Sequence, residues 1–503
     1  MEITGLILGV IVFGVIACRL LSVIYYWRNK GVPSARIVPF FGSYSSLLAK
    51  RLTFSGFQQH IYRTNEAAKY IGMMDFRTPA ILVKDPELIK QFAVKDFDAF
   101  PDHKRMIGAS ADSLFGNMLF FLTGERWKQL RVAISSTLTP SNMKIMWHSV
   151  SEISADLSTY LKQHPEHTKS IEMKDAFRRI TAETIATMIF GMKIDCVKNE
   201  RNKFYEWILT ATKIDSTLAY MKYTLYRGLP PIAKLFRLSI ISEKSVKFFR
   251  NLLVNNLNKR KNSQLDKPDF VQLFLAARAK RVDSKISVDD LMIQLYNLVF
   301  GGFDTSSTLM CYVAYELAVN PNIQSRLRLE IDQCLRDGNG VISYESLTSL
   351  KYLDAVVCET LRKYPPLPWT DRICRKTYEL PEAVPGGPPV TLEPNTVIFF
   401  PIYAIQNDPK HFPNPEIFDP ERFSDENKAK ILPYTYIPFG AGPRMCLGQR
   451  YAVMVTKVIL ADLIAKFVLK PTSMTPVPLK FAQRTPGLTI EGDLCLELTP
   501  REH

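Results

Sequence analysis

The chain has 503 residues, of which 47% are hydrophobic and 22% are charged, as in ordinary globular proteins. This composition excludes extensive disorder, and the length allows one large domain. The formal net charge of +15 favours anionic partners, either phospholipid surfaces or an acidic protein. Nucleic acid is the alternative, but the basic residues are dispersed and form no recognised nucleic-acid-binding motif.

The amino terminus, residues 1–27, is predicted to be a membrane anchor. Residues 3–24 are apolar apart from Arg19 and a few small or weakly polar side chains. As a helix they extend about 33 Å, enough to span a bilayer core, and Arg19 lies near enough to the end to snorkel. The aromatic residues of Tyr25–Trp27 are expected to form an interfacial belt. The positive charges within 28–30 orient the rest of the chain toward the cytoplasm.

Two other interpretations of this segment fit the sequence less well. A cleaved secretory signal would begin with a basic region and end at a cleavage site of small residues. This segment has Glu2 in place of the basic region and no clear cleavage site. Val15–Cys18 resembles a lipoprotein cleavage box, but no Lys or Arg precedes it. A basic, proline-rich hinge over 28–42 follows the anchor, and its prolines and glycines end the helix. Residues 43–503 contain no flexible linker and are predicted to form a single domain.

Hydrophobic periodicity predicts a mainly α protein with a small β portion. Short strands are expected over 71–83, interrupted at Gly72 and Pro79. A long helix is expected over Ser287–Asn320, because Ser287 can cap it and Pro321 follows it. The other expected elements are a helix over Phe270–Arg281, a small sheet over Pro381–Pro401, and a second long helix that begins near Gly448.

Eight cysteines are dispersed without a Cys-x-x-Cys pair, which indicates a reducing compartment. Cys446 stands out because it lies in the glycine-rich segment Phe439–Gly448. Gly442 and Gly448 allow the backbone to come close to a metal site, and Arg444 can pair with a carboxylate beside it. A haem supplies both an iron that takes a thiolate and propionates that take an arginine. The alternative is a buried cysteine in a Gly/Pro turn.

The pattern Phe-x-x-Gly-x-Arg-x-Cys-x-Gly resembles the haem-binding signature of the cytochrome P-450 family. Phrases such as Phe303-Asp-Thr-Ser-Ser and Tyr352-Leu-Asp-Ala-Val-Val-Cys are most similar to its animal microsomal members, especially insect detoxifying ones. The resemblance runs from the hinge to the cysteine loop. It implies the cytochrome P-450 fold, haem b as cofactor and Cys446 as the axial iron ligand. The further cofactor-binding residues that it implies are Trp127, Arg131, Arg372, Phe439, Gly442, Arg444 and Gly448.

Gly301-Gly-Phe-Asp304-Thr305 lies inside the predicted long helix, where two glycines cost about 1 kcal/mol each relative to alanine. A glycine pair that serves helix packing is one explanation. The segment also resembles the oxygen-activation motif of the family, which implies catalytic roles for Asp304 and Thr305 in proton delivery. Glu359 and Arg362 form a possible i,i+3 ion pair. With Arg422 they resemble the structural Glu-Arg-Arg network of the family.

The resemblance further implies a monooxygenase that inserts one atom of O₂ into an apolar molecule, a xenobiotic or an endogenous lipid-like compound. The electrons come from NADPH through a separate reductase, with a cytochrome b-type donor as a second candidate. The implied location is the endoplasmic reticulum membrane, facing the cytoplasm. Alternatives are a haem-thiolate isomerase or dehydratase that needs no reductase, and a non-catalytic haem-binding protein. The implied substrate-binding residues are Phe115, Leu119, Phe120, Phe300, Gly301, Leu367 and Trp369.

Overall fold

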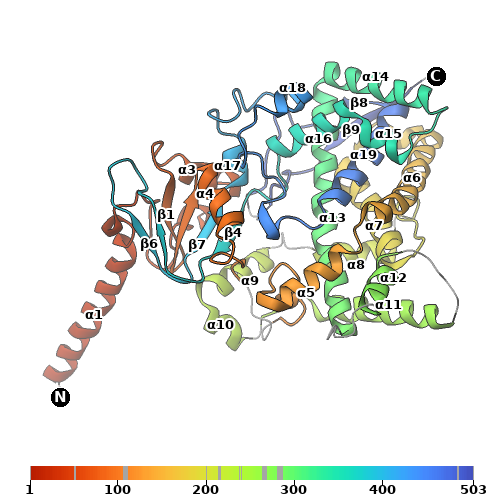
Figure 1. Cartoon of the computed structure of the whole chain (residues 1–503). Helices are drawn as coiled ribbons and strands as arrows, with labels where there is room; N and C mark the ends of the chain where they lie inside the picture. Colours follow the sequence, from red (N-terminus) through yellow and green to blue (C-terminus); the bar gives the residue numbers. More distant parts are fainter. Residues whose placement is uncertain are drawn as a thin grey trace.

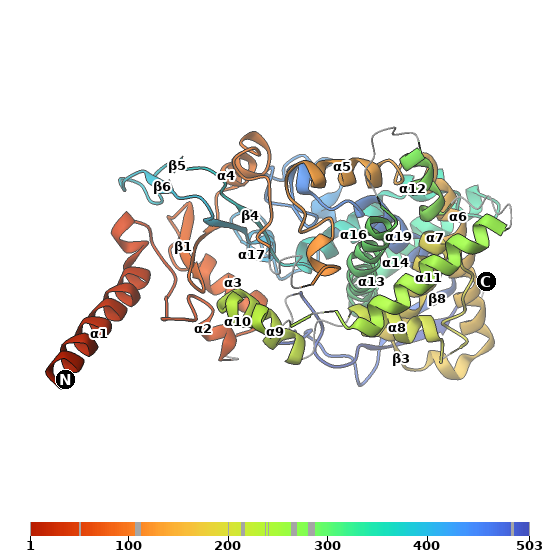
Figure 2. The ribbon, with the colours of Figure 1, turned by 90° about the horizontal axis from the view of Figure 1, so that it is seen from below.

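The computed structural model in Figure 1 describes residues 2–49, 52–105, 112–199, 201–212, 217–236, 238–239, 241–262, 269–279, 287–483 and 487–501. Helix α1 (Glu2–Tyr25) projects from a strand-rich part, and most of the other helices pack together on the far side of it. Within the described residues, no helix combines the length and the apolarity that a membrane crossing requires. The view from below in Figure 2 shows the same two parts side by side.

The strand-rich part contains a four-stranded sheet in the order β1-β2-β7-β4. Strands β1 (Tyr70–Asp75) and β2 (Thr78–Val83) pair antiparallel, and β2 pairs parallel with β7 (Val397–Phe400). Strand β4 (Thr370–Ile373) pairs antiparallel with β7. Segments about 300 residues apart in the sequence therefore meet in one sheet.

The predicted interruptions at Gly72 and Pro79 are wrong, because Gly72 lies inside β1 and Pro79 inside β2. The chain turns instead at Phe76, which adopts a positive φ of 55°. Position 72 requires glycine for a different reason, because a Cβ there would overlap the ring of Trp27. A glycine inside a strand thus marks a close approach by another segment.

The predicted interfacial belt is wrong for Trp27. Its side chain is completely buried, and its Nε1 donates a hydrogen bond to the Met73 carbonyl oxygen at 2.8 Å. Lys30 forms an ion pair with Glu393 at 3.3 Å. The chain that follows α1 is therefore fixed to the sheet. The burial of Trp27 could not be predicted from the sequence. A tryptophan at the end of an apolar helix is equally compatible with a membrane interface and with burial against a sheet.

The helical part is organised around α13 (Val288–Val319), which runs through it in Figure 1. Its ends confirm the prediction. Ser287 and Asp290 form a reciprocal capping box, and the helix stops at Asn320 before Pro321. Helices α7 (Met173–Phe190), α16 (Lys351–Lys363) and α19 (Gln449–Lys466) pack against α13, and α6 (Pro140–Gln163) packs against α7 and α19.

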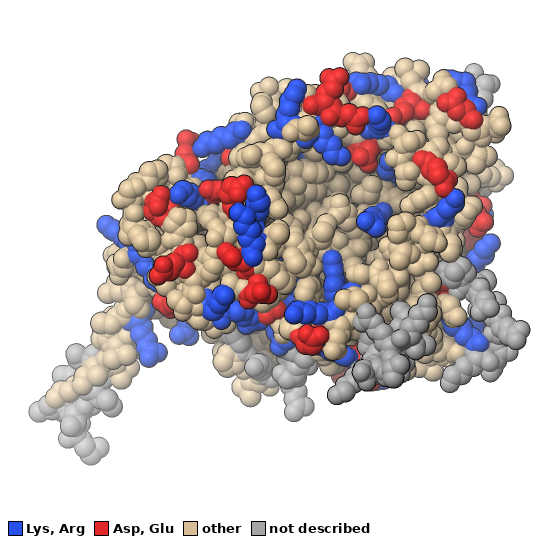
Figure 3. Space-filling view, in the orientation of Figure 1, with Lys and Arg blue, Asp and Glu red and all other residues tan. Residues whose placement is uncertain are grey.

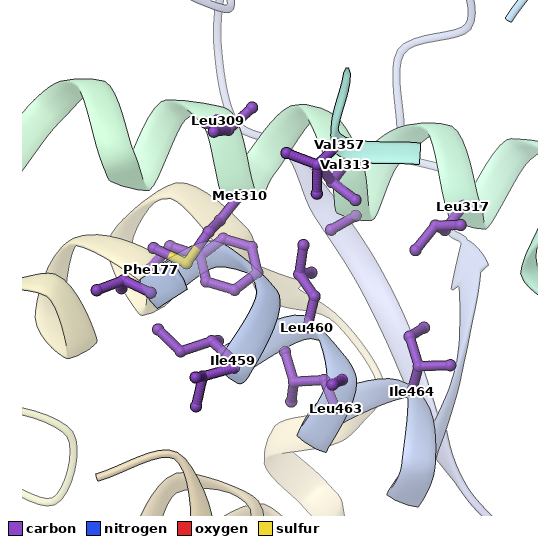
Figure 4. Close-up of a cluster of buried hydrophobic side chains, with 14 of the residues drawn as sticks. Phe177, Leu309, Met310, Val313, Leu317, Val357, Ile459, Leu460, Leu463 and Ile464 are labelled. Atoms are coloured by element: carbon purple, nitrogen blue, oxygen red, sulfur yellow. The ribbon is translucent and has the colours of Figure 1, made fainter. Parts of the chain in front are cut away.

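One apolar core joins these helices. Figure 4 shows buried side chains of this core from α7, α13, α16 and α19: Phe177, Leu309, Met310, Val313, Leu317, Val357, Ile459, Leu460, Leu463 and Ile464. This core holds α13 rigidly between the C-terminal helices and α7, so a side chain on α13 has a fixed position relative to the loop before α19.

The remaining helices are α2 (Ser45–Leu48), α3 (Phe54–Tyr62), α4 (Pro86–Lys90), α5 (Gly124–Ser135), α8 (Lys203–Thr212), α9 (Thr217–Gly228), α10 (Pro230–Leu235), α11 (Glu243–Asn262), α12 (Phe270–Ala279), α14 (Pro321–Asp337), α15 (Tyr344–Ser349), α17 (Ile402–Gln406) and α18 (Asp425–Lys428). The predicted end of the helix over 270–281 lies outside the described residues.

Two smaller sheets complete the fold. One has the order β3-β9-β8, and the other pairs β5 with β6. The expected sheet over Pro381–Pro401 is thus only partly correct, since β6 pairs with β5 but β7 joins the large sheet. The bounds of the remaining strands are β3 (Ile171–Glu172), β5 (Tyr378–Leu380), β6 (Val390–Leu392), β8 (Phe467–Pro471) and β9 (Cys495–Pro500). The prediction of a mainly helical protein with a minor β portion is confirmed.

Candidate haem-thiolate site

Cys446 lies on a short loop that runs from Phe439 to the start of α19. The backbone N–H of Cys446 donates to the Phe439 carbonyl oxygen at 2.8 Å, which closes the loop. Burial raises the pKa of the Cys446 thiol, whereas hydrogen bonds from the backbone N–H groups of Gly448 and Gln449 lower it. The side chain is nevertheless exposed to open space. The loop therefore presents one sulfur atom with amide donors directed at it.

The loop can approach the rest of the protein only because position 442 is a glycine. Gly442 has a φ of 70°, and a Cβ there would overlap the carbonyl oxygen of Ala93. Ala93 belongs to the short helical segment Gln91–Lys95, which packs against the turn Gly442–Arg444. Gly448 is different, because a Cβ there meets no atom within 4 Å.

Gly442→Ala is expected to lower the thermal unfolding temperature strongly. The left-handed backbone costs alanine about 1–2 kcal/mol, and the overlap with Ala93 adds to this cost. Gly386→Ala is the matched control, because Gly386 has a φ of 78° but open space where its Cβ would lie. A difference between the two variants in thermal unfolding measures the overlap alone. Equal unfolding temperatures would contradict the close approach.

Four of the predicted cofactor-binding residues converge beside the cysteine loop. The guanidinium of Arg444 lies 3.8 Å from the centre of the Trp127 ring. Arg131 donates to the Met445 carbonyl oxygen at 2.8 Å, and Arg372 donates to the Ala441 carbonyl oxygen at 3.0 Å. Arg444 belongs to the loop itself, and the other residues come from α5 and β4, so two distant segments contact the loop.

Two of these arginines are buried and lack a full set of partners. Within the described part of the chain, Nε of Arg372 and Nη1 of Arg444 have no hydrogen-bond partner. Burial lowers the pKa of each guanidinium to about 10, and the charge of Arg372 further lowers that of Arg444. An anion in this space would satisfy both donors. Haem propionates therefore fit the residues that are present.

Asp102 and His103 also belong to this region, although the sequence analysis did not identify them. Asp102 accepts a hydrogen bond from Arg444 at 2.8 Å and pairs with Arg375 at 2.7 Å. Nδ1 of His103 lies 3.1 Å from a carboxylate oxygen of Asp371. Burial lowers the pKa of His103, so the ring is neutral and Nδ1 donates its proton to the carboxylate. The partners lie about 270 to 340 residues away in sequence, so no local motif indicates these contacts.

The glycine pair of α13 borders open space on the other side of the site. A Cβ at Gly301 or at Gly302 would meet no atom within 4 Å. The Thr305 hydroxyl donates to the Gly301 carbonyl oxygen at 2.5 Å. One carboxylate oxygen of Asp304 accepts two hydrogen bonds from Arg178, at 2.6 and 2.9 Å. Open space thus lies beside the two glycines, and Asp304 is held by an ion pair.

An apolar cluster connects this segment of α13 to the cysteine loop. Phe303 and Trp127 are buried members of the cluster, and Phe300 and Leu447 pack against it. Leu447 directly follows Cys446 in the sequence. This cluster therefore links α13, α5 and the cysteine loop through apolar contacts.

The predicted substrate-binding residues divide into open and packed positions. Phe120 is 42% exposed and Leu367 is 50% exposed. Phe115 and Leu119 are buried in the apolar cluster, where Phe115 packs edge-on against Phe300. Their role in substrate binding stays a prediction. Trp369 stacks on Phe399 with 4.3 Å between ring centres and contacts Phe54, which attaches it to the sheet.

The three charged residues expected to form a network lie together. Glu359 and Arg362 are fully buried and form a bidentate ion pair with distances of 2.7 and 2.9 Å. Nε of Arg422 lies 3.4 Å from the same carboxylate. Arg362 also donates to the carbonyl oxygens of Gln406 and Pro415, so the pair connects α16 to the segment that precedes the cysteine loop.

The sequence was compared with protein families and with individual known proteins, and both comparisons point to one family. The family described as Cytochrome P450 matches residues 33–492. The chain is 39% identical to Cytochrome P450 9e2 of Blattella germanica, over 95% of this chain and 94% of that protein. It is 34% identical to Cytochrome P450 6k1 of the same insect, over 94% and 92%. It is 31% identical to Probable cytochrome P450 9f2 of Drosophila melanogaster, over 95% of each chain. The chain therefore belongs to the cytochrome P450 family, whose members are haem-iron monooxygenases.

Proposed function

We propose that the protein inserts one oxygen atom into apolar small molecules, using electrons that a partner reductase takes from NADPH. The observations that carry this proposal are the match to the Cytochrome P450 family over residues 33–492 and, within it, the exposed Cys446 beside two incompletely paired arginines. The substrate class includes foreign compounds and endogenous lipid-like molecules. Phe120, Phe300, Gly301 and Leu367 offer a mainly apolar lining that orients such molecules loosely.

Two kinds of side chain are proposed to bind the haem: a cysteine thiolate and arginine guanidinium groups. Cys446 ligates the iron, and its amide neighbours stabilise the thiolate. Arg372 and Arg444, supported by Trp127 and Arg131, bind the propionates. The bound haem supplies the redox chemistry that activates O₂. Phe439 and Gly448 shape the loop but contribute no charge.

Proton delivery is assigned to Asp304 and Thr305. Arg178 occupies one carboxylate oxygen of Asp304, and the other oxygen remains available for a proton from solvent because the side chain is 46% exposed. The Thr305 hydroxyl lies one residue further along the helix, where it donates to the Gly301 carbonyl oxygen. We assign it the last transfer into the site.

The electron donor is proposed to dock on the face beside the cysteine loop. Lys95, Lys128 and Arg450 are exposed there, on segments that border or contact the loop. Such a surface suits an acidic flavoprotein reductase, and a cytochrome b-type protein is a second donor with the same charge preference. Elsewhere, Figure 3 shows basic and acidic side chains interspersed over the face seen in Figure 1.

The cellular location is proposed from the amino terminus. Helix α1 projects from the body in Figure 1, and its exposed apolar side chains include Ile11, Phe13, Val15 and Leu21. We assign residues 1–27 to a membrane anchor, and 28–42 to the basic, proline-rich segment that joins the anchor to the sheet. Residues 43–503 then form the catalytic domain on the cytoplasmic side of the endoplasmic reticulum.

Thr305→Ala is expected to separate electron use from product formation. The assay contains the reductase and a substrate that the unmodified protein converts. The variant should still consume NADPH, but the amount of product per NADPH should fall by about tenfold or more, because a proton-donating hydroxyl is lost. Ser307→Ala is the control, because its hydroxyl is buried and bonded within α13. A reductase-independent isomerase would turn over without NADPH, and a mere haem-binding protein would form no product. Either result would overturn the proposal.

A further inference from the structure

A second cavity lies between the C-terminal end of α13, the start of α14 and strand β8, and its volume is about 470 Å³. It is separate from the cysteine loop, since none of its lining residues belongs to the site described above. The lining residues that carry the argument are Val319, Arg328, Val468, Lys470, Pro471 and Val477.

Two positive charges line this cavity without a partner. Nε of Arg328 is buried and makes no hydrogen bond, and neither Arg328 nor Lys470 forms an ion pair within the residues that the structure describes. Other arginines of α14 are engaged: Arg326 pairs with Glu421 at 2.5 Å, and Arg336 donates to Gln333 at 2.6 Å. Arg326 and Arg336 therefore have partners, whereas Arg328, which lines the cavity, has no ion-pair partner among the described residues.

Within the described residues, no acidic group forms an ion pair with Arg328 or Lys470. Asp332 lies one turn after Arg328 on α14, but it forms a bidentate ion pair with Arg501. Glu497 faces Lys470 across the β8–β9 pair, and its carboxylate accepts a hydrogen bond from Thr499 at 2.9 Å. Glu316, near the end of α13, is bound by Lys363 and Tyr364. The unpaired charges therefore favour an external anion.

The remaining walls are apolar. Val319, Val468, Pro471 and Val477 line the cavity, and Val477 is 66% exposed at its edge. We propose that this cavity binds an amphipathic organic anion, a carboxylate with a short alkyl chain, as a second ligand. The carboxylate pairs with Arg328 and Lys470, and the alkyl chain covers the apolar wall. This inference is independent of the proposed function.

The position of the cavity favours a free anion over a bilayer lipid. In both Figure 1 and Figure 2, α14 and β8 lie at the end of the molecule opposite α1. A headgroup in the bilayer that holds α1 would be separated from the cavity by the length of the catalytic domain.

The test uses the full-length, haem-loaded protein in zwitterionic lipid, with a saturating imidazole ligand to block the haem site. Decanoate that carries a terminal diazirine is the probe, and labelled peptides are identified by mass spectrometry. The expected label lies in the peptides that contain 318–331 and 465–480. Label confined to other peptides would overturn the proposal without the need for any variant.

Affinity supplies the second measurement. The double variant Arg328→Gln, Lys470→Gln is expected to weaken decanoate binding by about tenfold or more, the effect of lost charge-assisted hydrogen bonds. Decanol, which has no charge, should bind equally to both proteins. Arg336→Gln is the control on the same helix. Equal decanoate affinity in all proteins, or displacement of the probe by phosphatidylserine vesicles alone, would contradict binding of a free anion.

Discussion

The Cys446→Ser variant is expected to lose the strongly red-shifted Soret band of its reduced carbon-monoxide complex, together with all monooxygenase turnover. Serine keeps the shape of the loop but replaces a polarisable thiolate with a hydroxyl that stays protonated. The amide donors of Gly448 and Gln449 that stabilise the thiolate then have no charge to act on. The measurement is the carbon-monoxide difference spectrum of membranes that contain the protein and its reductase.

Cys334→Ser is the matched control, because Cys334 is a buried cysteine on α14, outside the cysteine loop. It should retain the spectrum and the turnover. A red-shifted band that persists in Cys446→Ser would remove this residue as the iron ligand, and the assignment of the surrounding arginines to propionates would fail with it.

The elements that the sequence predicts well are those whose cause is local. The long helix begins and ends where expected because Ser287 and Pro321 act on the turns next to them. The cysteine loop is likewise readable, because Gly442 and Cys446 lie within a few residues of each other. In both cases the physical reason for the structure is contained in a short segment of chain.

The features that the sequence does not predict depend on distant partners. Asp102 becomes part of the site because Arg444 reaches it from 342 residues away. Trp27 is buried because β1 leaves room for it at Gly72. Phe115 and Phe120 are close in sequence and similar in chemistry, yet one packs in the core and the other stays open. Hydrophobicity alone cannot distinguish these outcomes, since each is decided by what lies opposite the side chain.

The Glu359→Gln variant is expected to lose about 3–5 kcal/mol of folding stability, because it leaves the buried charge of Arg362 without a counter-ion. Gln can still accept one hydrogen bond, but it cannot balance a guanidinium that has no access to water. The loss is a large part of the stability of an ordinary domain. The expected result is little haem-loaded protein after expression, measured as haem per polypeptide and by denaturant unfolding of what remains.

Arg422→Gln separates this effect from a general sensitivity of the region. Arg422 contacts the same carboxylate at 3.4 Å and its side chain is 14% exposed, so Glu359 keeps Arg362 when Arg422 is lost. Its cost should be about 1 kcal/mol or less, because the remaining pair is complete and water reaches the vacated position. Equal losses in the two variants would mean that the carboxylate is shared evenly by both arginines. A loss in neither would mean that α16 and the segment before the cysteine loop are held together by their apolar contacts alone.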